Sequence, residues 1–69
     1  KKPLTTKELQ EYIIESLPGV GPSLAKSLLE QFGSVENIFK ADEEELKKVE
    51  KIGDTKAKEI SRVIKEKYS

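Results

Sequence analysis

The sequence of 69 residues contains no cysteine, histidine, methionine or tryptophan, and its only aromatic residues are two tyrosines and two phenylalanines. Without cysteine the chain forms no disulfide, and without a His/Cys cluster it offers no structural zinc site. No apolar run is long enough to span a membrane or to serve as a signal peptide, so we expect an intracellular, cytoplasmic segment without a membrane partner. We also expect no metal and no cofactor. A chain this short buries only ~60% of the surface that its unfolded form exposes, which favours a stabilising partner.

The chain has no net charge, because its 13 basic residues balance its 13 acidic ones. The distribution is uneven: residues 1–46 carry five lysines and nine acids, whereas residues 47–69 carry eight basic residues and four acids. A basic C-terminal third can attract phosphate even in a neutral domain. A solvated, lysine-rich helix face would give the same pattern, so charge alone leaves both interpretations open.

Apolar residues recur at helical spacing, and no stretch alternates at period two for long enough to form a strand. We therefore expect an all-α domain of five short helices, at about residues 6–16, 22–31, 35–40, from 42 onward, and 54–67. Thr5 or Thr6 is expected to cap the first helix, with Glu8 completing a capping box. Gly33 is placed to end the second helix. Asp54 or Thr55 is expected to cap the last one.

The apolar spacing also predicts which side of each helix is buried. In the first helix the expected core side is Leu9, Tyr12, Ile13 and Leu17, and Ile14 lies off this stripe. In the last helix the expected buried residues are Ala57, Ile60 and Ile64, with Val63 and Tyr68 as further candidates.

The stretch Leu17-Pro18-Gly19-Val20-Gly21-Pro22 predicts a tight turn that leads directly into a helix. Gly19 and Gly21 can adopt positive φ and have no Cβ, so a backbone or a ligand can approach closely. Pro22 suits the first helical turn, where a missing N–H costs nothing. The outward N–H groups and the helix dipole favour an anion, most commonly phosphate. A compact helix–helix connection would use the same glycines, so this alternative stays open.

An internal repeat appears when the chain is shifted by 32 positions. Gly21 then falls on Gly53 and Lys26 on Lys58. Residues of similar character also coincide: Leu17 with Val49, Val20 with Ile52, Ser23 with Thr55, Ala25 with Ala57, and Leu28 with Ile60. We expect two helix–turn–helix units, at about 6–32 and 42–68, related by a pseudo-twofold axis and joined by a linking helix at about 34–40. Both turns then lie on one side of a single domain covering residues 1–69, where they could hold two backbones of one duplex.

The first turn and the helix after it, Leu17-Pro18-Gly19-Val20-Gly21-Pro22…Ala25-Lys26…Leu28, resemble the helix-hairpin-helix motif. The doubled arrangement resembles the tandem (HhH)2 domain of the XPF/Mus81 family of structure-specific endonucleases. The segments 32–38 and 44–57 are especially similar to the archaeal Hef-type members. The resemblance covers nearly the whole chain, from about residue 9 to residue 68.

This resemblance implies binding of branched or forked DNA through its phosphate backbone, without sequence preference. The parent protein would then be a prokaryotic endonuclease with a helicase, active in DNA repair and at stalled forks. Carried over by position, the phosphate-binding residues are Gly19, Val20, Gly21, Ser23 and Lys26 in the first hairpin and Lys51, Ile52, Gly53, Thr55, Lys56 and Lys58 in the second.

The second hairpin departs from the family pattern at two positions. Lys51 stands where the first hairpin has Gly19, which narrows the available backbone conformations and would keep a phosphate further away. Asp54 stands where the first has Pro22, and its carboxylate would repel a phosphate. We therefore expect the first hairpin to bind phosphate more closely. Pairing of the lysines with neighbouring acids is the alternative for their role.

The resemblance also implies a homodimer formed through the second hairpin unit and the C-terminal end. The implied interface residues are Phe39, Val49, Ile52, Ile64 and Tyr68, with an ordinary intramolecular core as the alternative for Ile52 and Ile64. A protein-interaction module with little DNA affinity is the alternative function, although it does not need paired glycine turns. We expect no catalysis, because residues 42–45 fan around a helix start instead of converging on a metal, and the acidic nuclease motif is absent.

Overall fold

The computed structural model describes residues 4–69, and these residues form five α-helices and no strand. The helices are α1 (Thr6–Glu15), α2 (Pro22–Phe32), α3 (Val35–Lys40), α4 (Glu43–Lys47) and α5 (Asp54–Lys65). The expected all-α class is confirmed, and the predicted helix ends lie within two residues of the observed ones. The described part of the chain is flat, with extents of 39 × 32 × 18 Å.

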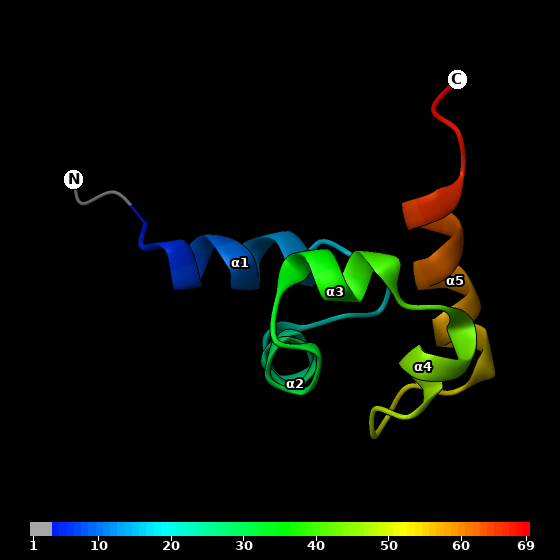
Figure 1. Ribbon diagram of the computed structural model, residues 1–69, viewed down its shortest axis with the longest axis horizontal. Helices are drawn as coiled ribbons and strands as arrows, with labels where there is room; N and C mark the ends of the chain where they lie inside the picture. The colour runs from blue at the N-terminus through cyan, green and yellow to red at the C-terminus, as the bar shows by residue number, and fades with distance from the viewer. Residues whose placement is uncertain (1–3) are drawn as a thin grey trace.

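The helices form two hairpin units joined by α3. In the first unit α1 packs on α2, in the second α4 packs on α5, and α3 contacts both α1 and α2. Figure 1 shows α1 and α3 running in nearly the same direction while α5 stands across them at the other end of the molecule. The linking helix therefore packs on the first unit and leads into the second.

Side chains cap three of the helices, the first of them at the predicted position. Thr5 Oγ1 accepts a hydrogen bond from the Glu8 N–H at 3.1 Å, and Glu8 Oε1 accepts one from the Thr5 N–H at 2.8 Å. Ser34 caps α3, and Asp42 forms a capping box with Glu45 at the start of α4. Gly33 ends α2 with φ 87°, the left-handed conformation that glycine adopts without strain.

The predicted side-chain cap of α5 is wrong. Gly53 is the N-cap residue, no side chain caps this helix, and Asp54 is its first helical residue. The carboxylate of Asp54 instead pairs with Lys47 of α4 at 2.9 Å, which draws it away from the backbone N–H groups of its own helix.

The core follows the internal repeat. Buried residues of the first unit match buried residues of the second at the shift of 32 positions. The pairs are Ile14 with Leu46, Leu17 with Val49, Val20 with Ile52, Ala25 with Ala57, and Leu28 with Ile60, and Ile38 and Ala41 complete the cluster from the linking segment. Because these equivalent residues are buried in both units and belong to one cluster, the two units share one core.

The predicted buried side of the first helix is wrong except at Leu17, which is 7% exposed. Ile14 is completely buried, whereas Leu9, Tyr12 and Ile13 are 46%, 69% and 44% exposed. The side of α1 that faces the core instead runs through Gln10, Glu11 and Ile14, which are half-buried or buried, and α1 extends beyond α3 at its N-terminal end (Figure 1). An apolar stripe along such a helix does not have to face the core.

The outer side of α5 also differs from expectation. Ala57 and Ile60 are buried and Ile64 packs against the core, but Val63 is 49% exposed and Tyr68 is fully exposed. Both lie where no other helix covers α5 and the segment after it.

Candidate nucleic-acid interface

The two hairpins have the same backbone conformation despite their different sequences. Gly19 has φ 72° and Lys51, its repeat partner, has φ 77°. Gly21 and Gly53 are both extended, with φ −97° and −95°. Lys51 is the only non-glycine residue with positive φ among residues 4–69, so the expected change of conformation on losing a glycine does not occur. The expected positive φ at Gly21 is not observed either.

Matched hydrogen bonds explain this equal geometry. The Val20 N–H donates to the Leu17 carbonyl at 3.1 Å, and the Ile52 N–H donates to the Val49 carbonyl at 3.1 Å. The side chains of Val20 and Ile52 are buried as well. Val20 and Ile52 therefore anchor their hairpins to the core, and their N–H groups are already used. Unlike the prediction from the sequence, this geometry leaves neither N–H group free to donate a hydrogen bond to a phosphate.

Other backbone N–H groups of the hairpins are free. Within residues 4–69, the N–H groups of Gly21 and Ser23 donate to no acceptor, and the same holds for Gly53 and Thr55. Each pair lies at the start of a helix of 11 or 12 residues, where the helix dipole adds partial positive charge. The free N–H groups and the dipole together suit an anion such as phosphate.

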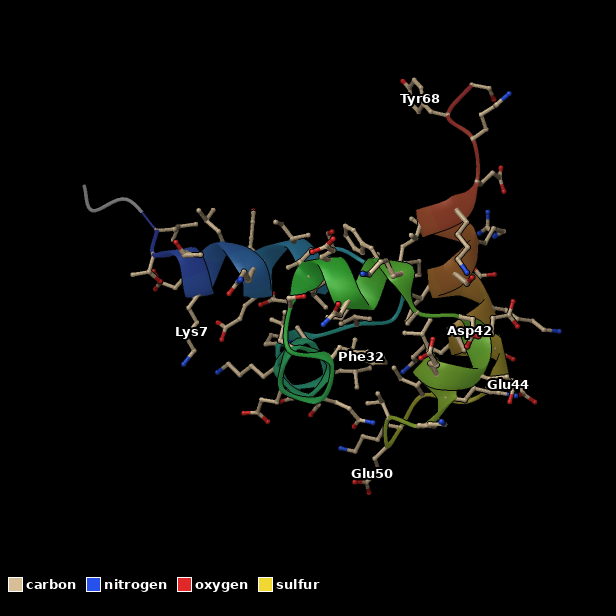
Figure 2. The ribbon with its side chains drawn as sticks, viewed as in Figure 1. Lys7, Phe32, Asp42, Glu44, Glu50 and Tyr68 are labelled. Atoms are coloured by element: carbon tan, nitrogen blue, oxygen red, sulfur yellow. The ribbon has the colours of Figure 1, made fainter. Side chains whose placement is uncertain are left out.

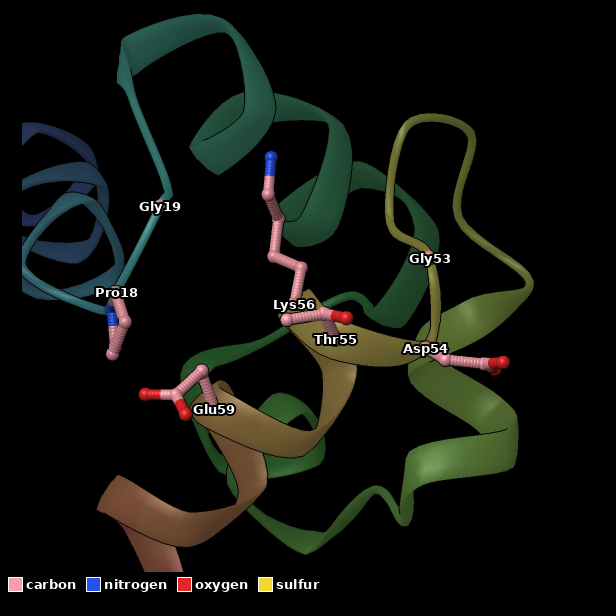
Figure 3. Close-up of a pocket in the computed structure, with 7 residues that line it drawn as sticks. All are labelled: Pro18, Gly19, Gly53, Asp54, Thr55, Lys56 and Glu59. Atoms are coloured by element: carbon pink, nitrogen blue, oxygen red, sulfur yellow. The ribbon is translucent and has the colours of Figure 1, made fainter.

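The hairpins meet at two adjoining surface hollows that share Gly19 and Lys56. The first hollow is lined by Pro18, Gly19, Gly53, Asp54, Thr55, Lys56 and Glu59, as Figure 3 shows, and the second by Gly19, Gly21, Pro22, Ser23, Leu24, Ser27, Glu50, Lys51 and Lys56. The structure thus brings together seven of the eleven residues predicted for phosphate binding: Gly19, Gly21, Ser23, Lys51, Gly53, Thr55 and Lys56. Lys26 and Lys58 are exposed further along α2 and α5 and line neither hollow.

Lys47 modifies the electrostatics of the second hairpin, a role that was not predicted from the sequence. Its ammonium lies 2.9 Å from a carboxylate oxygen of Glu44 and 2.9 Å from one of Asp54. The hydrogen bond from Lys47 lowers the pKa of Asp54, and Asp54 and Glu44 together raise the pKa of Lys47. Asp54 also points away from Lys56 (Figure 3). Its repulsion of a phosphate is therefore weaker than the sequence suggested.

The repeat contains a signal for this ion pair. At the shift of 32 positions Lys47 replaces Glu15 and Asp54 replaces Pro22. The simultaneous appearance of opposite charges at these two positions points to a contact that the first unit does not have.

Replacing Asp54 with asparagine is expected to lower the thermal midpoint slightly at pH 7. Because the folded state lowers the pKa of Asp54 below its ordinary 3.8, the ion pair stabilises the protein above that pH. The contribution disappears as the pH falls through the folded-state pKa. The raised pKa of Lys47 preserves the pair until the pH exceeds the ordinary lysine value of 10.5.

Thermal unfolding at pH 7 and about pH 2 measures this effect, and the two proteins should unfold at the same temperature at the lower pH. The pair is exposed, so its effect is small. An unchanged difference between the proteins at both pH values would contradict the role of the ion pair.

The predicted dimer-interface residues lie in different environments. Val49 and Ile52 are 3% and 4% exposed and belong to the chain's own core, so their side chains are not available to a partner. Ile64 packs partly against that core. Phe39 is 38% exposed, and Tyr68 lies fully exposed beyond the end of α5 (Figure 2). The intramolecular alternative thus holds for Val49 and Ile52, while Phe39 and Tyr68 remain accessible.

In residues 4–69 no group of three or more His, Cys, Asp or Glu side chains is arranged to hold a metal ion. None of the helices in this part of the chain has the length and hydrophobicity needed to cross a membrane.

Known proteins that resemble this chain include a family built from two helix-hairpin-helix motifs, in agreement with the geometry of the two hairpins. The model of the SAM-like helix-hairpin-helix tandem family matches residues 10–66. The chain is 50% identical over 68 residues, 99% of its length, to a protein of Methanocaldococcus jannaschii named as an ATP-dependent RNA helicase. It is 39% identical over 66 residues, 94% of its length, to the 3′-flap repair endonuclease Xpf of Saccharolobus solfataricus.

A solved structure of XPF from Aeropyrum pernix in complex with DNA superimposes with a TM-score of 0.88 at 42% identity, over 94% of this chain and 32% of that one. The chain spans only 9% of the helicase and 28% of the endonuclease. The chain therefore belongs to the SAM-like tandem helix-hairpin-helix family, in the form that occurs in archaeal XPF endonucleases.

Proposed function

We propose that this domain binds DNA through the phosphate backbone, without sequence preference, and that its two hairpins hold two backbones of a branched or forked duplex. The observation that carries the proposal is the matched pair of hairpins, each with free N–H groups at the start of a helix. A connection needed only for packing does not require equal φ angles at Gly19 and Lys51, one of which is unfavourable for lysine.

Hydrogen bonds from backbone N–H groups to phosphate oxygens fix a protein on the duplex but carry no sequence information. The flanking cations, Lys51 and Lys56 at the hollows and Lys26 and Lys58 on the helices, add sequence-independent attraction. The XPF structure that superimposes on this chain is itself a complex with DNA, which supports the same ligand here.

The catalytic steps of the parent protein are proposed to lie outside this chain. The matched relatives are named as a helicase and a flap repair endonuclease, and this chain corresponds to a small part of each. The domain would then deliver a nuclease or helicase to branched DNA during repair, in the cytoplasm of a prokaryote. It would not cleave DNA by itself.

A salt titration tests the proposed function. The affinity of the chain for forked DNA and for plain duplex of equal length is measured by fluorescence anisotropy at several salt concentrations. Backbone binding predicts that log K falls linearly with log[salt], with a slope of roughly −0.9 for each phosphate neutralised. Duplexes of unrelated sequence should bind equally well, and the fork should bind more tightly. Absence of binding at low salt would contradict the proposal and favour a protein-interaction module.

A homodimer is the second part of the proposed function. The supporting observation is a set of large apolar side chains that the fold leaves exposed: Leu9, Tyr12 and Ile13 on α1, Phe39 on α3, Val63 on α5, and Tyr68. Contiguous exposed apolar side chains are typical of interaction sites, and Leu9, Tyr12 and Ile13 lie within five residues of one helix. This set replaces the buried Val49 and Ile52 as interface candidates, and it extends the expected interface to α1.

Sedimentation equilibrium is expected to give an average mass that rises with protein concentration toward twice 7.8 kDa. Replacing Tyr12 with glutamate should shift the equilibrium toward monomer, because a charge would be buried without a partner. Replacing the exposed Gln31 of α2 with glutamate serves as the control. A monomer mass at every concentration would contradict the dimer.

A further inference from the structure

A side chain of the second motif lies across the first hairpin. A Cβ atom added to Gly19 would lie 3.1 Å from Cε of Lys56 and 3.5 Å from its Cδ and Cγ, so the aliphatic stem of Lys56 passes directly over Gly19. Lys56 belongs to α5, and Figure 3 shows it extending from the start of that helix into the space between the hairpins. The absence of a side chain at Gly19 is what lets this stem approach.

The stem brings the ammonium of Lys56 to the first hairpin. Lys56 lines the same hollow as Gly21 and Ser23, whose N–H groups are free, and it forms no ion pair with an acid in the described residues. The acids nearest along the chain are occupied elsewhere: Asp54 pairs with Lys47, and Glu59 pairs with Arg62 at 2.9 Å. The charge of Lys56 is therefore available for a ligand of the first hairpin.

The repeat predicts a reciprocal crossing, in which a side chain of the first motif lies near the second hairpin. At the shift of 32 positions Lys56 corresponds to Leu24, and Gly19 corresponds to Lys51. Leu24 of α2 and Lys51 of the second hairpin do line one hollow together. The third residue of the second helix in each motif thus lines a hollow together with a residue from the hairpin of the other motif. Only one of these two side chains carries a charge.

We propose that Lys56 is a phosphate-positioning residue of the first hairpin, although the sequence places it in the second motif. The first hairpin then holds its backbone with the N–H groups of α2 and a cation from α5, whereas the second hairpin receives the apolar Leu24 instead of a cation. The two hairpins therefore differ in the charge that they offer a phosphate, and the exchange of Pro22 for Asp54 adds to this difference. This inference rests on the proposed binding of DNA backbone.

A double-mutant cycle tests whether Lys56 acts together with the first hairpin or with the second. Gly21→Ala and Gly53→Ala are matched backgrounds, because both glycines are extended and an added Cβ meets nothing within 4 Å at either. Lys56→Gln is combined with each background. Lys58→Gln, two residues further along α5 and in neither hollow, is the charge-matched control. Circular dichroism checks that each variant is folded, and the affinity for one duplex is measured across a range of salt concentrations.

Lys56→Gln alone is expected to weaken binding about threefold to tenfold and to reduce the magnitude of the salt slope by about 0.9. In the Gly21→Ala background the loss of affinity caused by Lys56→Gln should differ from that of Lys56→Gln alone by about threefold or more, because Lys56 and the hairpin at Gly21 act on one phosphate. In the Gly53→Ala background the effect should persist within about twofold. Lys58→Gln should behave additively in both backgrounds.

Coupling of Lys56 to Gly53 instead of Gly21, or additivity with both, would overturn the inference. Leu24→Lys supplies the reverse test, since a cation at this position should increase the magnitude of the salt slope by about 0.9 through the second hairpin. An unchanged slope in folded Leu24→Lys protein would also contradict the reciprocal crossing. If the unsubstituted chain binds no DNA, the proposed function itself fails, which is a different result from additive binding.

Discussion

Gly21→Val is expected to weaken duplex DNA binding by about tenfold or more while leaving the fold intact. Its backbone is extended, with φ −97°, so valine fits without strain, and the added Cβ meets no atom within 4 Å. That empty space is where a phosphate would approach the free N–H groups of Gly21 and Ser23. Loss of a hydrogen bond to a charged group costs about 1.5–3 kcal/mol, and about 1.4 kcal/mol corresponds to a factor of ten in affinity.

Stability separates this effect from unfolding. A glycine replaced at a compatible position keeps or slightly raises the stability, because the unfolded chain loses conformational freedom. Gly21 is also the N-cap of α2, where valine is less favourable than glycine, so the two effects oppose each other and the thermal midpoint of Gly21→Val should stay close to that of the unsubstituted protein. Gln31→Val, at the exposed far end of α2, is the control for added apolar surface. Unchanged affinity in a folded Gly21→Val protein would mean that the hairpin only connects helices.

The substitution Ile14→Ala is expected to destabilise the domain by about 2–5 kcal/mol, enough to unfold much of so small a domain. Ile14 is completely buried in the shared core. The truncated side chain leaves a cavity, which neighbouring side chains can fill only if the packed helices move. The neighbouring Ile13→Ala removes the same atoms from a residue that is 44% exposed, and should cost less than about 1 kcal/mol.

Denaturant unfolding at a protein concentration below the dimerisation range measures the pair of variants. Low concentration is needed because Ile13 belongs to the exposed apolar set proposed for the dimer interface. Equal destabilisation by the two substitutions would contradict the burial of Ile14 and favour the apolar stripe that the helical spacing predicted.

Most of the fold is predictable from the sequence because local signals and the repeat agree. Thr5 with Glu8, Ser34 and Gly33 mark helix ends through short-range hydrogen bonds that depend on few other residues. The side of α1 that is buried is not predictable in this way, since it depends on which neighbours reach the helix. The repeat did contain the answer, because the shift that matches Gly21 with Gly53 also matches Ile14 with Leu46.

The hairpin geometry is predictable only in part. Glycine spacing correctly located both turns, but it suggested that Lys51 would alter the second one. Tertiary anchoring by Ile52 and its hydrogen bond to Val49 holds Lys51 in a left-handed conformation that propensity disfavours. The contact of Lys56 with Gly19 joins residues 37 positions apart, and no local pattern encodes it.

The most direct test of phosphate binding by the hairpins is a titration of the 15N-labelled chain with duplex DNA, followed by the amide resonances in heteronuclear NMR spectra. Hairpin binding predicts the largest shifts at the free N–H groups of Gly21, Ser23, Gly53 and Thr55, with small shifts in α3. Shifts confined to the exposed apolar residues of α1, or to the lysines after residue 62, would contradict it.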